Sequence, residues 1–378
     1  MNDNPIAAND IELFNMYSYK DDKYLLGSKE KDRYVIVNKE KGTYYLNLLH
    51  DLDGSLSILQ LADKWGMSLE QVHHIIDSFY DKGLLYNSLE KNDNTEVNRL
   101  SKKIITIECN LLKNFSKKMS HHIVIAFLLL LGILVVFDLY MLFAGQVNSI
   151  NIFKLNNSYI LSLVLSSLIM IPSFLFHELC HSIVALKYGL KPSKIDICLY
   201  LYLFPLYYVK IKGLYTIYYK KRIIIMSAGI IGNVFLAVIM LALYIIFRKG
   251  IFLTVVLSQF NIILANINPF SLSDGYYIMT MIFKTENLRK NMFDIIANLN
   301  FKKYRSNRKL FFYIIINLLI IAFNVMYISK YSYNVICELF DRQLSTWIIP
   351  IGNVLLLLFY ILVVHIRFKE KKISNGEK

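Results

Sequence analysis

Two histidines and a glutamate stand within five residues of one another in a long apolar stretch of the sequence. His177, Glu178 and His181 form the pattern HExxH. On a helix the i, i+4 spacing places both imidazoles on one face, within reach of one Zn²⁺, and leaves Glu178 beside the ion as a general base for bound water. Three ionisable groups in an apolar helix are costly without a metal or a polar cavity. The pattern therefore predicts a metal site with hydrolytic chemistry.

A catalytic zinc takes a third protein ligand and keeps a fourth position for water. The apolar segment 251–267 is followed by a lone carboxylate, Asp274, in a stretch where Pro269 and Gly275 interrupt regular helix. Irregular backbone at membrane depth is tolerated where it lines a cavity, which favours Asp274 as the third ligand. The alternative for this residue is an interfacial carboxylate that caps a turn.

The elements that position these residues are predicted to lie in a membrane. The chain has 378 residues, of which 55% are hydrophobic and 19% charged, with a mean hydropathy of +0.41. These values exclude an ordinary soluble domain and a disordered chain. The four cysteines lack CxxC spacing and predict neither a disulfide framework nor a cysteine metal site. We predict an α-helical polytopic membrane protein with about six transmembrane helices, at 123–144, 159–186, 223–247, 251–267, 310–328 and 344–366.

Basic residues are distributed unevenly between the loops. The loops on one side of the predicted helices hold 26 Lys and Arg residues, against 5 in the alternate loops. By the positive-inside rule we expect a multi-pass protein of the cell membrane with both termini in the cytoplasm. The second and fourth segments then run inward, which brings His177, His181 and Asp274 toward the same cytoplasmic side.

These residues resemble the motifs of the site-2 protease family of intramembrane zinc metalloproteases. That family pairs an HExxH helix with a later NxxPxxxxDG element, matched here by Asn266, Pro269, Asp274 and Gly275. The resemblance implies that Asp274 is the third Zn²⁺ ligand and that the glutamate of the first motif is the base. It also implies that Asn266 and Pro269 lie at the substrate.

A GxxxN element lies between the two motifs, at Gly229 and Asn233. In the family this asparagine is thought to help hold the substrate or its oxyanion. The resemblance therefore implies a catalytic role for Asn233 and a substrate-binding role for Gly229. On residues alone, Asn233 could equally be an interhelical hydrogen-bonding group beside small residues. Two departures, Ser273 before Asp-Gly and Ile230 after the first glycine, leave every predicted ligand in place.

Residues 192–212, between the second and third segments, are rich in Tyr, Leu and Val. Alternation such as Tyr208-Val209-Lys210-Ile211-Lys212 predicts strand rather than helix. In the family a re-entrant β-loop at this place offers an edge to the substrate, and an unwound peptide can pair with such an edge. The alternative is an aromatic loop at the membrane interface.

The front of the chain, residues 1–100, is predicted to form a small soluble α+β domain of winged-helix-like type. Runs at 34–37 and 43–46 predict a hairpin around a Lys-Gly turn. Two helices are expected to follow, one at 57–65 and one that opens at 68 with a capping box.

Charge and pattern indicate what this front domain binds. Between Asp51 and Glu90 seven acids accompany two lysines, a net charge of −5 that disfavours contact with nucleic acid. The stretch from Asp53 to Leu85 resembles PqqD-like domains, which bind the leader peptides of ribosomally made peptides as a strand added at a sheet edge. The resemblance implies a leader peptide as a partner of this domain.

We predict five regions along the chain. They are the winged-helix/PqqD-like domain (1–100), a basic juxtamembrane linker (101–121), an intramembrane zinc protease core with four crossings (122–278), a basic cytoplasmic loop (279–309), and two further transmembrane helices with a basic tail (310–378).

The predicted function is hydrolysis of a peptide bond in a membrane-associated peptide or protein by a Zn²⁺ enzyme embedded in the lipid bilayer. The two parts together resemble the peptide zinc metalloproteases associated with bacterial peptide-maturation systems, which implies maturation or export of a bacteriocin-like peptide. Two alternatives stay open. One is a peptide transporter or immunity protein without proteolysis, and the other is a regulatory protease that cleaves a membrane-anchored signalling protein.

Overall fold

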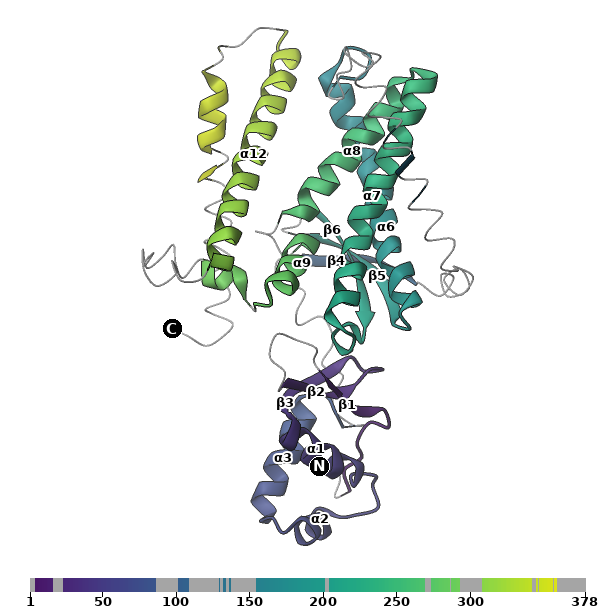
Figure 1. Ribbon diagram of the computed structural model, residues 1–378, viewed down its shortest axis with the longest axis vertical. Coiled ribbons are helices and arrows are strands. Elements are labelled where there is room, and N and C mark those ends of the chain that lie inside the picture. The colour runs from purple at the N-terminus through teal and green to yellow at the C-terminus, as the bar shows by residue number, and fades with distance from the viewer. Residues whose placement is uncertain are drawn as a thin grey trace. The chain divides into compact units, whose positions relative to one another are not determined.

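The computed structural model describes residues 4–15, 23–85, 101–108, 154–200, 204–268, 273–285, 287–292, 308–341 and 347–355, with residues 129, 132, 133, 136, 345, 357 and 358. Helices predominate among them (Figure 1). Contacts divide the chain into one compact unit made of Met1–Val124 and Leu175–Gly229, and a second made of Ile125–Phe174 and Ile230–Lys378. Two long helices, α6 (Tyr159–Lys187) and α7 (Tyr219–Phe247), are continuous through both units.

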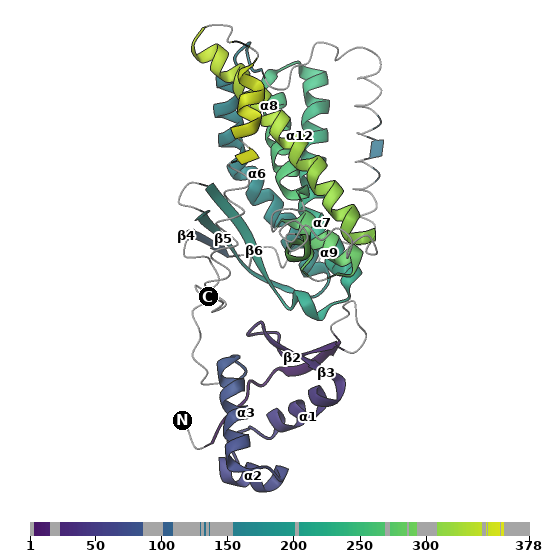
Figure 2. The same ribbon diagram turned by 90° about the vertical axis from the view of Figure 1, so that its left-hand side faces the viewer.

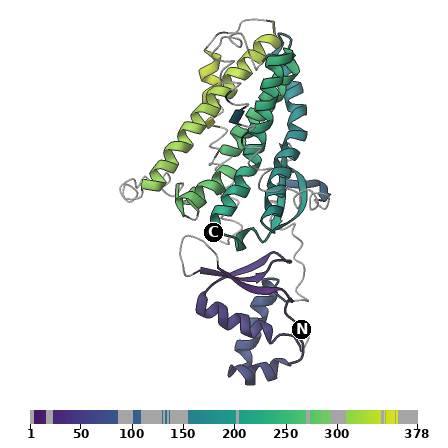
Figure 3. The same ribbon diagram turned by 45° about the vertical axis from the view of Figure 1, so that its right-hand side comes forward.

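The N-terminal part of the first unit consists of a small sheet and three helices. Strands β1 (Ile11–Asn15), β2 (Lys23–Ser28) and β3 (Arg33–Asn38) are antiparallel, in the order β1-β2-β3. Helices α1 (Lys39–His50), α2 (Ile58–Trp65) and α3 (Leu69–Asp81) lie on one face of this sheet (Figures 2 and 3). The apolar sides of the strands and helices share one core, which includes Leu26, Leu49, Leu61, Val72 and Phe79.

The predicted starts of α2 and α3 are confirmed, and each is a complete capping box. Ser57 Oγ accepts a hydrogen bond from the Gln60 N–H, and Gln60 Oε1 accepts one from the Ser57 N–H. Ser68 and Gln71 form the same pair of bonds at the start of α3. Each cap satisfies N–H groups that a helix end leaves without a partner and contributes about 1 kcal/mol.

The hairpin predicted around Gly42 is wrong. Residues 34–37 lie in β3 as expected, but residues 43–46 lie in α1, and the partner of β3 is β2. A Cβ on Gly42 would lie 2.7 Å from Leu13 Cδ1 and 2.9 Å from Val37 Cγ2, so this glycine lets α1 pack tightly on the strands. The domain is therefore three strands followed by three helices, and its winged-helix character stays a prediction.

Among the residues that the structure describes, four helices are long and apolar enough to cross a membrane. They are α6, α7, α8 (Gly250–Ile267) and α12 (Arg308–Leu339), and they correspond to the second, third, fourth and fifth predicted segments. The first predicted segment, 123–144, lies almost wholly outside the described residues. Of the sixth predicted segment, 344–366, the structure describes residues 345, 347–355, 357 and 358. Residues 348–355 among them are helical. Four apolar helices are consistent with a membrane protein, while the count of six stays a prediction.

A second antiparallel sheet belongs to the first unit. It consists of β4 (Ser101–Glu108), β5 (Lys191–Tyr200) and β6 (Phe204–Lys212), in the order β4-β5-β6 (Figure 2). The strands predicted within 192–212 are thus present. Residues 101–108, expected to be the start of a linker, form β4 and pair with β5. A 3-10 turn at Leu214–Thr216 leads from β6 toward α7.

Polar contacts, one buried and one partly buried, join the helices of the second unit. Ser258 Oγ on α8 donates to the Ser166 carbonyl of α6 at 2.9 Å, and Tyr327 OH on α12 donates to Asn261 Oδ1 on α8 at 2.8 Å. Helix α9 (Asp274–Phe283) follows α8, and Tyr276 from α9 packs with Leu310 and Tyr313 of α12 in a small apolar core. These contacts fix α8, α9 and the first half of α6, which hold part of the predicted site.

Candidate metal centre

The HExxH residues lie in the last third of α6. The side chains of His177, Glu178 and His181 are 2%, 8% and 4% exposed, although the helix around them is strongly apolar. As the i, i+4 spacing predicts, the two imidazoles share one face, and their Nε2 atoms are 3.1 Å apart. Two nitrogens bound 2.0–2.1 Å from one tetrahedral ion lie roughly 3.3 Å apart, so the pair is arranged as two ligands of one ion would be.

A backbone carbonyl of α7 orients the second imidazole. His181 Nδ1 lies 2.6 Å from the Ile225 carbonyl oxygen, which can only accept a hydrogen bond. The proton of the neutral ring therefore sits on Nδ1, and the Nε2 lone pair points toward His177. A carbonyl or carboxylate behind the outer nitrogen is the usual support of a metal-binding histidine, because it fixes both the tautomer and the ring angle.

Gly229 provides the space in which the two imidazoles sit. It lies one helical turn after Ile225 on α7, and a Cβ at this position would be 2.5 Å from His177 Cε1, His177 Nε2 and His181 Nε2. No side chain fits at that distance, so the α7 backbone itself closes over the metal-facing nitrogens. The structure thus places Gly229 against the two imidazoles, whereas the resemblance had implied a substrate-binding residue.

The carboxylate of Asp274 completes the group. Asp274 is the first residue of α9, and the ligand atoms of His177, His181 and Asp274 all lie within 4.8 Å of one another. The next residue, Gly275, permits this placement, because a Cβ there would lie 2.3 Å from the Ile267 carbonyl oxygen at the end of α8. Asp274 is therefore held at a tight α8–α9 corner.

These three residues fit a metal ion. Two imidazole nitrogens and one carboxylate oxygen are a donor set that divalent transition metals accept, and the two histidines are buried. Two features favour bound metal over an ordinary polar contact. One is the tautomer of His181, which the Ile225 carbonyl fixes, and the other is the close packing of the Gly229 backbone against both imidazoles, here called the cradle at Gly229. The predicted ligand set therefore forms a group that could hold a metal ion, with its chemical identity left to experiment.

Glu178 follows His177 directly on α6, and its side chain is held by a strand. Its Oε2 accepts a hydrogen bond from the Val209 N–H of β6 at 2.8 Å. Opposite this point β5 has an irregularity, because Pro192 pairs with Ile211 and Ile195 with Val209, which leaves an extra residue in β5. Such bulges re-aim groups beside functional sites. Here the Val209 N–H donates its hydrogen bond to the Glu178 carboxylate.

The other residues predicted to contact the substrate or its oxyanion are Asn233, Asn266 and Pro269. Asn233, one turn after Gly229 on α7, is fully buried. Asn266 donates through Nδ2 to the Ile262 carbonyl of its own helix at 3.0 Å. Pro269 lies outside the described residues. Substrate or oxyanion contacts for Asn233, Asn266 and Pro269 stay predictions.

Sequence reasoning missed the groups that support the site. The Ile225 carbonyl and the Val209 N–H are backbone atoms and have no residue-type signal. Gln259, a fully buried amide in the middle of apolar α8, does have one: a polar residue within a predicted transmembrane segment is a functional candidate. Its surroundings are described below.

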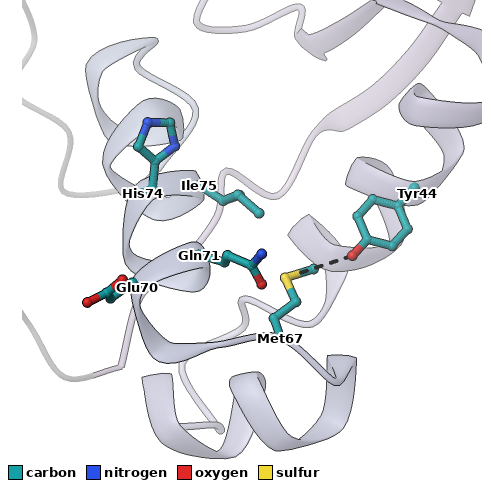
Figure 4. A pocket seen from close by; sticks show the side chains of 6 residues that line it. All are labelled: Tyr44, Met67, Glu70, Gln71, His74 and Ile75. Atoms are coloured by element: carbon teal, nitrogen blue, oxygen red, sulfur yellow. Dashed lines mark hydrogen bonds between the residues drawn. The ribbon is translucent and has the colours of Figure 1, made fainter.

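A separate cavity of about 440 Å³ lies in the N-terminal part. Figure 4 shows it between α1 and α3, with Tyr44 and Met67 on one side and Glu70, Gln71, His74 and Ile75 on the other. The Tyr44 hydroxyl lies 3.8 Å from the Met67 sulfur. His74 is exposed and is not among the three residues of the metal group.

Comparison with protein-family models, with curated proteins and with solved structures found no match to this chain.

Proposed function

We propose that this protein is an intramembrane zinc endopeptidase of the site-2 protease type. The observation that supports it best is the buried group of two imidazoles and one carboxylate on helices apolar enough to cross a membrane. A His₂-carboxylate set that leaves one position open is characteristic of hydrolytic zinc sites. Zinc bound there would supply an acidified water and polarise the peptide carbonyl.

The chain's own residues would perform the proton transfers. Glu178 is the neighbour of His177 on α6 and is not one of the three residues of the metal group, which suits a base that takes a proton from the attacking water and returns it to the leaving amine. The Val209 N–H would hold the carboxylate in the orientation that this transfer needs. Asn233, buried one turn from Gly229, is proposed to donate a hydrogen bond to the developing oxyanion.

The substrate would be a membrane-associated peptide, which reaches the site from the bilayer. In the β4-β5-β6 order of the described strands β6 stands at the edge, and the same strand contacts Glu178. An unwound peptide that pairs with this edge would run past the base. Orientation with both termini in the cytoplasm of a cell, and maturation of a bacteriocin-like peptide as the biological role, belong to the same proposal.

The leader-peptide partner proposed for the N-terminal domain also relies on a sheet edge. Among the described strands, β3 ends the β1-β2-β3 order, and Ile36 on it is 55% exposed. An exposed edge with an apolar side chain can accept an added peptide strand.

The Glu178→Gln variant tests the enzymatic proposal. Glutamine keeps the shape and can still accept the Val209 hydrogen bond, but it cannot take up a proton. We expect metal content equal to wild type and loss of cleavage of single-span peptides by at least about 100-fold, the lower range for general-base removal. Wild-type metal with unchanged cleavage would show that Glu178 is not the base.

The role of the Val209 N–H can be tested by Val209→Pro, with Val209→Ala as the matched control. Proline removes the N–H that faces Glu178 and also fixes the backbone φ angle, which is tolerated on an edge strand where the N–H is not used in the ladder. We expect kcat to fall about 10- to 100-fold with little change in KM or metal content, as for other groups that orient a reactive residue. Alanine keeps the N–H and should retain most activity. Equal losses in both variants would instead indicate a packing role.

A further inference from the structure

Gln259 is a buried amide in a mainly apolar helix, whose other polar side chains are Thr254, Ser258, Asn261 and Asn266. It is fully buried in α8, and its Nε2 donates to Ser173 Oγ on α6 at 2.6 Å. The Ser173 hydroxyl in turn donates to the Ile169 carbonyl at 2.8 Å. The hydroxyl proton is thus committed to Ile169, so the serine oxygen must accept from Gln259, and this order fixes which side of the amide is the carbonyl.

The other side of this amide faces no donor. Among the residues the structure describes, none gives a hydrogen bond to Gln259 Oε1, although the atom is fully buried. A buried carbonyl without a donor is costly, and more so at membrane depth, where water is scarce. Neighbouring polar groups of α8 do not share this feature, since Thr254 and Ser258 both donate to carbonyls of their own helix. The Gln259 Oε1 atom is therefore available to accept a hydrogen bond.

The distance along α6 relates this acceptor to the metal group. Ser173 stands four residues before His177, which places it on the same helix face one turn earlier. One turn is a rise of about 5–6 Å. An extended peptide advances about 3.3 Å per residue, so a peptide that enters between α6 and α8 with its cleaved bond at the metal would pass Gln259 about two residues away from that bond.

We propose that Gln259 is a substrate-binding residue whose amide carbonyl accepts a hydrogen bond from a main-chain N–H of the peptide, about two residues from the cleaved bond. This role rests on the proposed proteolysis, and it adds that the substrate is bound as an extended peptide. A membrane-spanning peptide must be unwound before its carbonyl can be attacked, and unwinding releases N–H groups that need acceptors inside the bilayer. Gln259 supplies one, which selects extended backbone over any particular side chain.

The first experiment compares full-length wild type, Gln259→Met and Thr254→Val in lipid nanodiscs. The probe is a synthetic single-span peptide that wild type cleaves. Methionine keeps the length of the side chain and loses its amide, so we expect kcat/KM to fall roughly tenfold, chiefly through KM, with metal content unchanged. Thr254→Val removes a buried hydroxyl that bonds only within its own helix and should cleave like wild type.

The second experiment removes the other partner of the hydrogen bond. N-methylation of the peptide at successive positions should weaken cleavage by wild type at the positions that pair with β6 and at one further position, about two residues from the cleaved bond, whose N–H meets Gln259. Methylation at the position that meets Gln259 should not lower the cleavage rate of Gln259→Met any further, because this variant has already lost the hydrogen bond. If Gln259→Met does not accumulate, Gln259→Asn, with a shorter amide, takes its place and is expected to give the same loss.

The outcomes separate this inference from the proposal beneath it. Wild-type KM in Gln259→Met, or methylation losses that are identical in both proteins, overturns the role of Gln259 while Glu178-dependent cleavage still stands. Failure of wild type to cleave any peptide overturns the proteolytic function, and the role of Gln259 falls with it.

Discussion

Replacement of His181 by alanine is expected to weaken metal binding by more than about 100-fold, because loss of an outer partner of a ligand alone costs 10- to 100-fold. His181 contributes one of the three ligand atoms, and the cavity its loss would leave is walled by the backbone at Gly229. His177→Ala should behave alike. Asp274→Asn, which keeps the shape and removes the charge, should also lose metal. Measurement is by metal analysis of purified protein and by competition with a chelator.

The control for these ligand variants is His74→Ala, which removes an exposed imidazole of the N-terminal part that is not in the metal group. It should bind metal like wild type. Stoichiometric, chelator-resistant metal in both His177→Ala and His181→Ala would mean that the ion is held elsewhere, and the assignment of the site would fail.

Gly229→Ala is expected to weaken metal binding without any change of ligand. The added Cβ would lie 2.5 Å from both Nε2 atoms, a separation that real Cβ atoms do not show, so the imidazoles or α7 must move. Both imidazoles are buried, and His181 Nδ1 is also hydrogen-bonded to the carbonyl of Ile225, which lies on α7 like Gly229. Neither ring can therefore move away from the added Cβ and still face the ion. We expect at least about a tenfold loss of affinity, as for disrupted support of a ligand.

Helix propensity acts in the opposite direction, which makes this result diagnostic. Glycine to alanine inside a helix favours the helix by about 1 kcal/mol, so a weaker α7 cannot explain metal loss. Gly352→Ala is the control, since its Cβ would meet only Ser329 Cβ at an ordinary 3.7 Å. Metal content equal to wild type in both variants would show that the cradle at Gly229 is not needed.

The apolar helices and the shared face of the two histidines could be predicted from the sequence because their signals are strong and local. Hydropathy over about 20 residues located α6, α7, α8 and α12, and the i, i+4 spacing placed His177 and His181 on one face. The supporting groups could not be predicted in this way. The carbonyl of Ile225 and the N–H of Val209 exist at every residue, and only the fold decides which of them meets a ligand or a base.

Glycine was the least predictable residue type. Gly42 was interpreted as a turn, yet it permits a close approach of α1 to the strands. The close approach of Gly229 to the two imidazoles was not foreseen either, while its contact with substrate stays a prediction. The sequence shows that a Cβ is missing but not what would collide with it. The run Thr43-Tyr44-Tyr45-Leu46 failed for a related reason, because four residues cannot separate a strand period from a helix period, and packing against Leu13 and Val37 favoured helix.

The most direct test of the central claim is hydrolysis in ¹⁸O-labelled water by purified wild type, with Glu178→Gln and chelator-stripped wild type beside it. Single-span synthetic peptides and peptides extracted from the membranes of the same cells serve as probes, and the products are analysed by mass spectrometry. The account predicts a new carboxyl terminus that contains one ¹⁸O atom, formed by metal-loaded wild type and by neither of the other two samples. Metal-loaded wild type that leaves every peptide intact, or cleavage that persists after both changes, would contradict it.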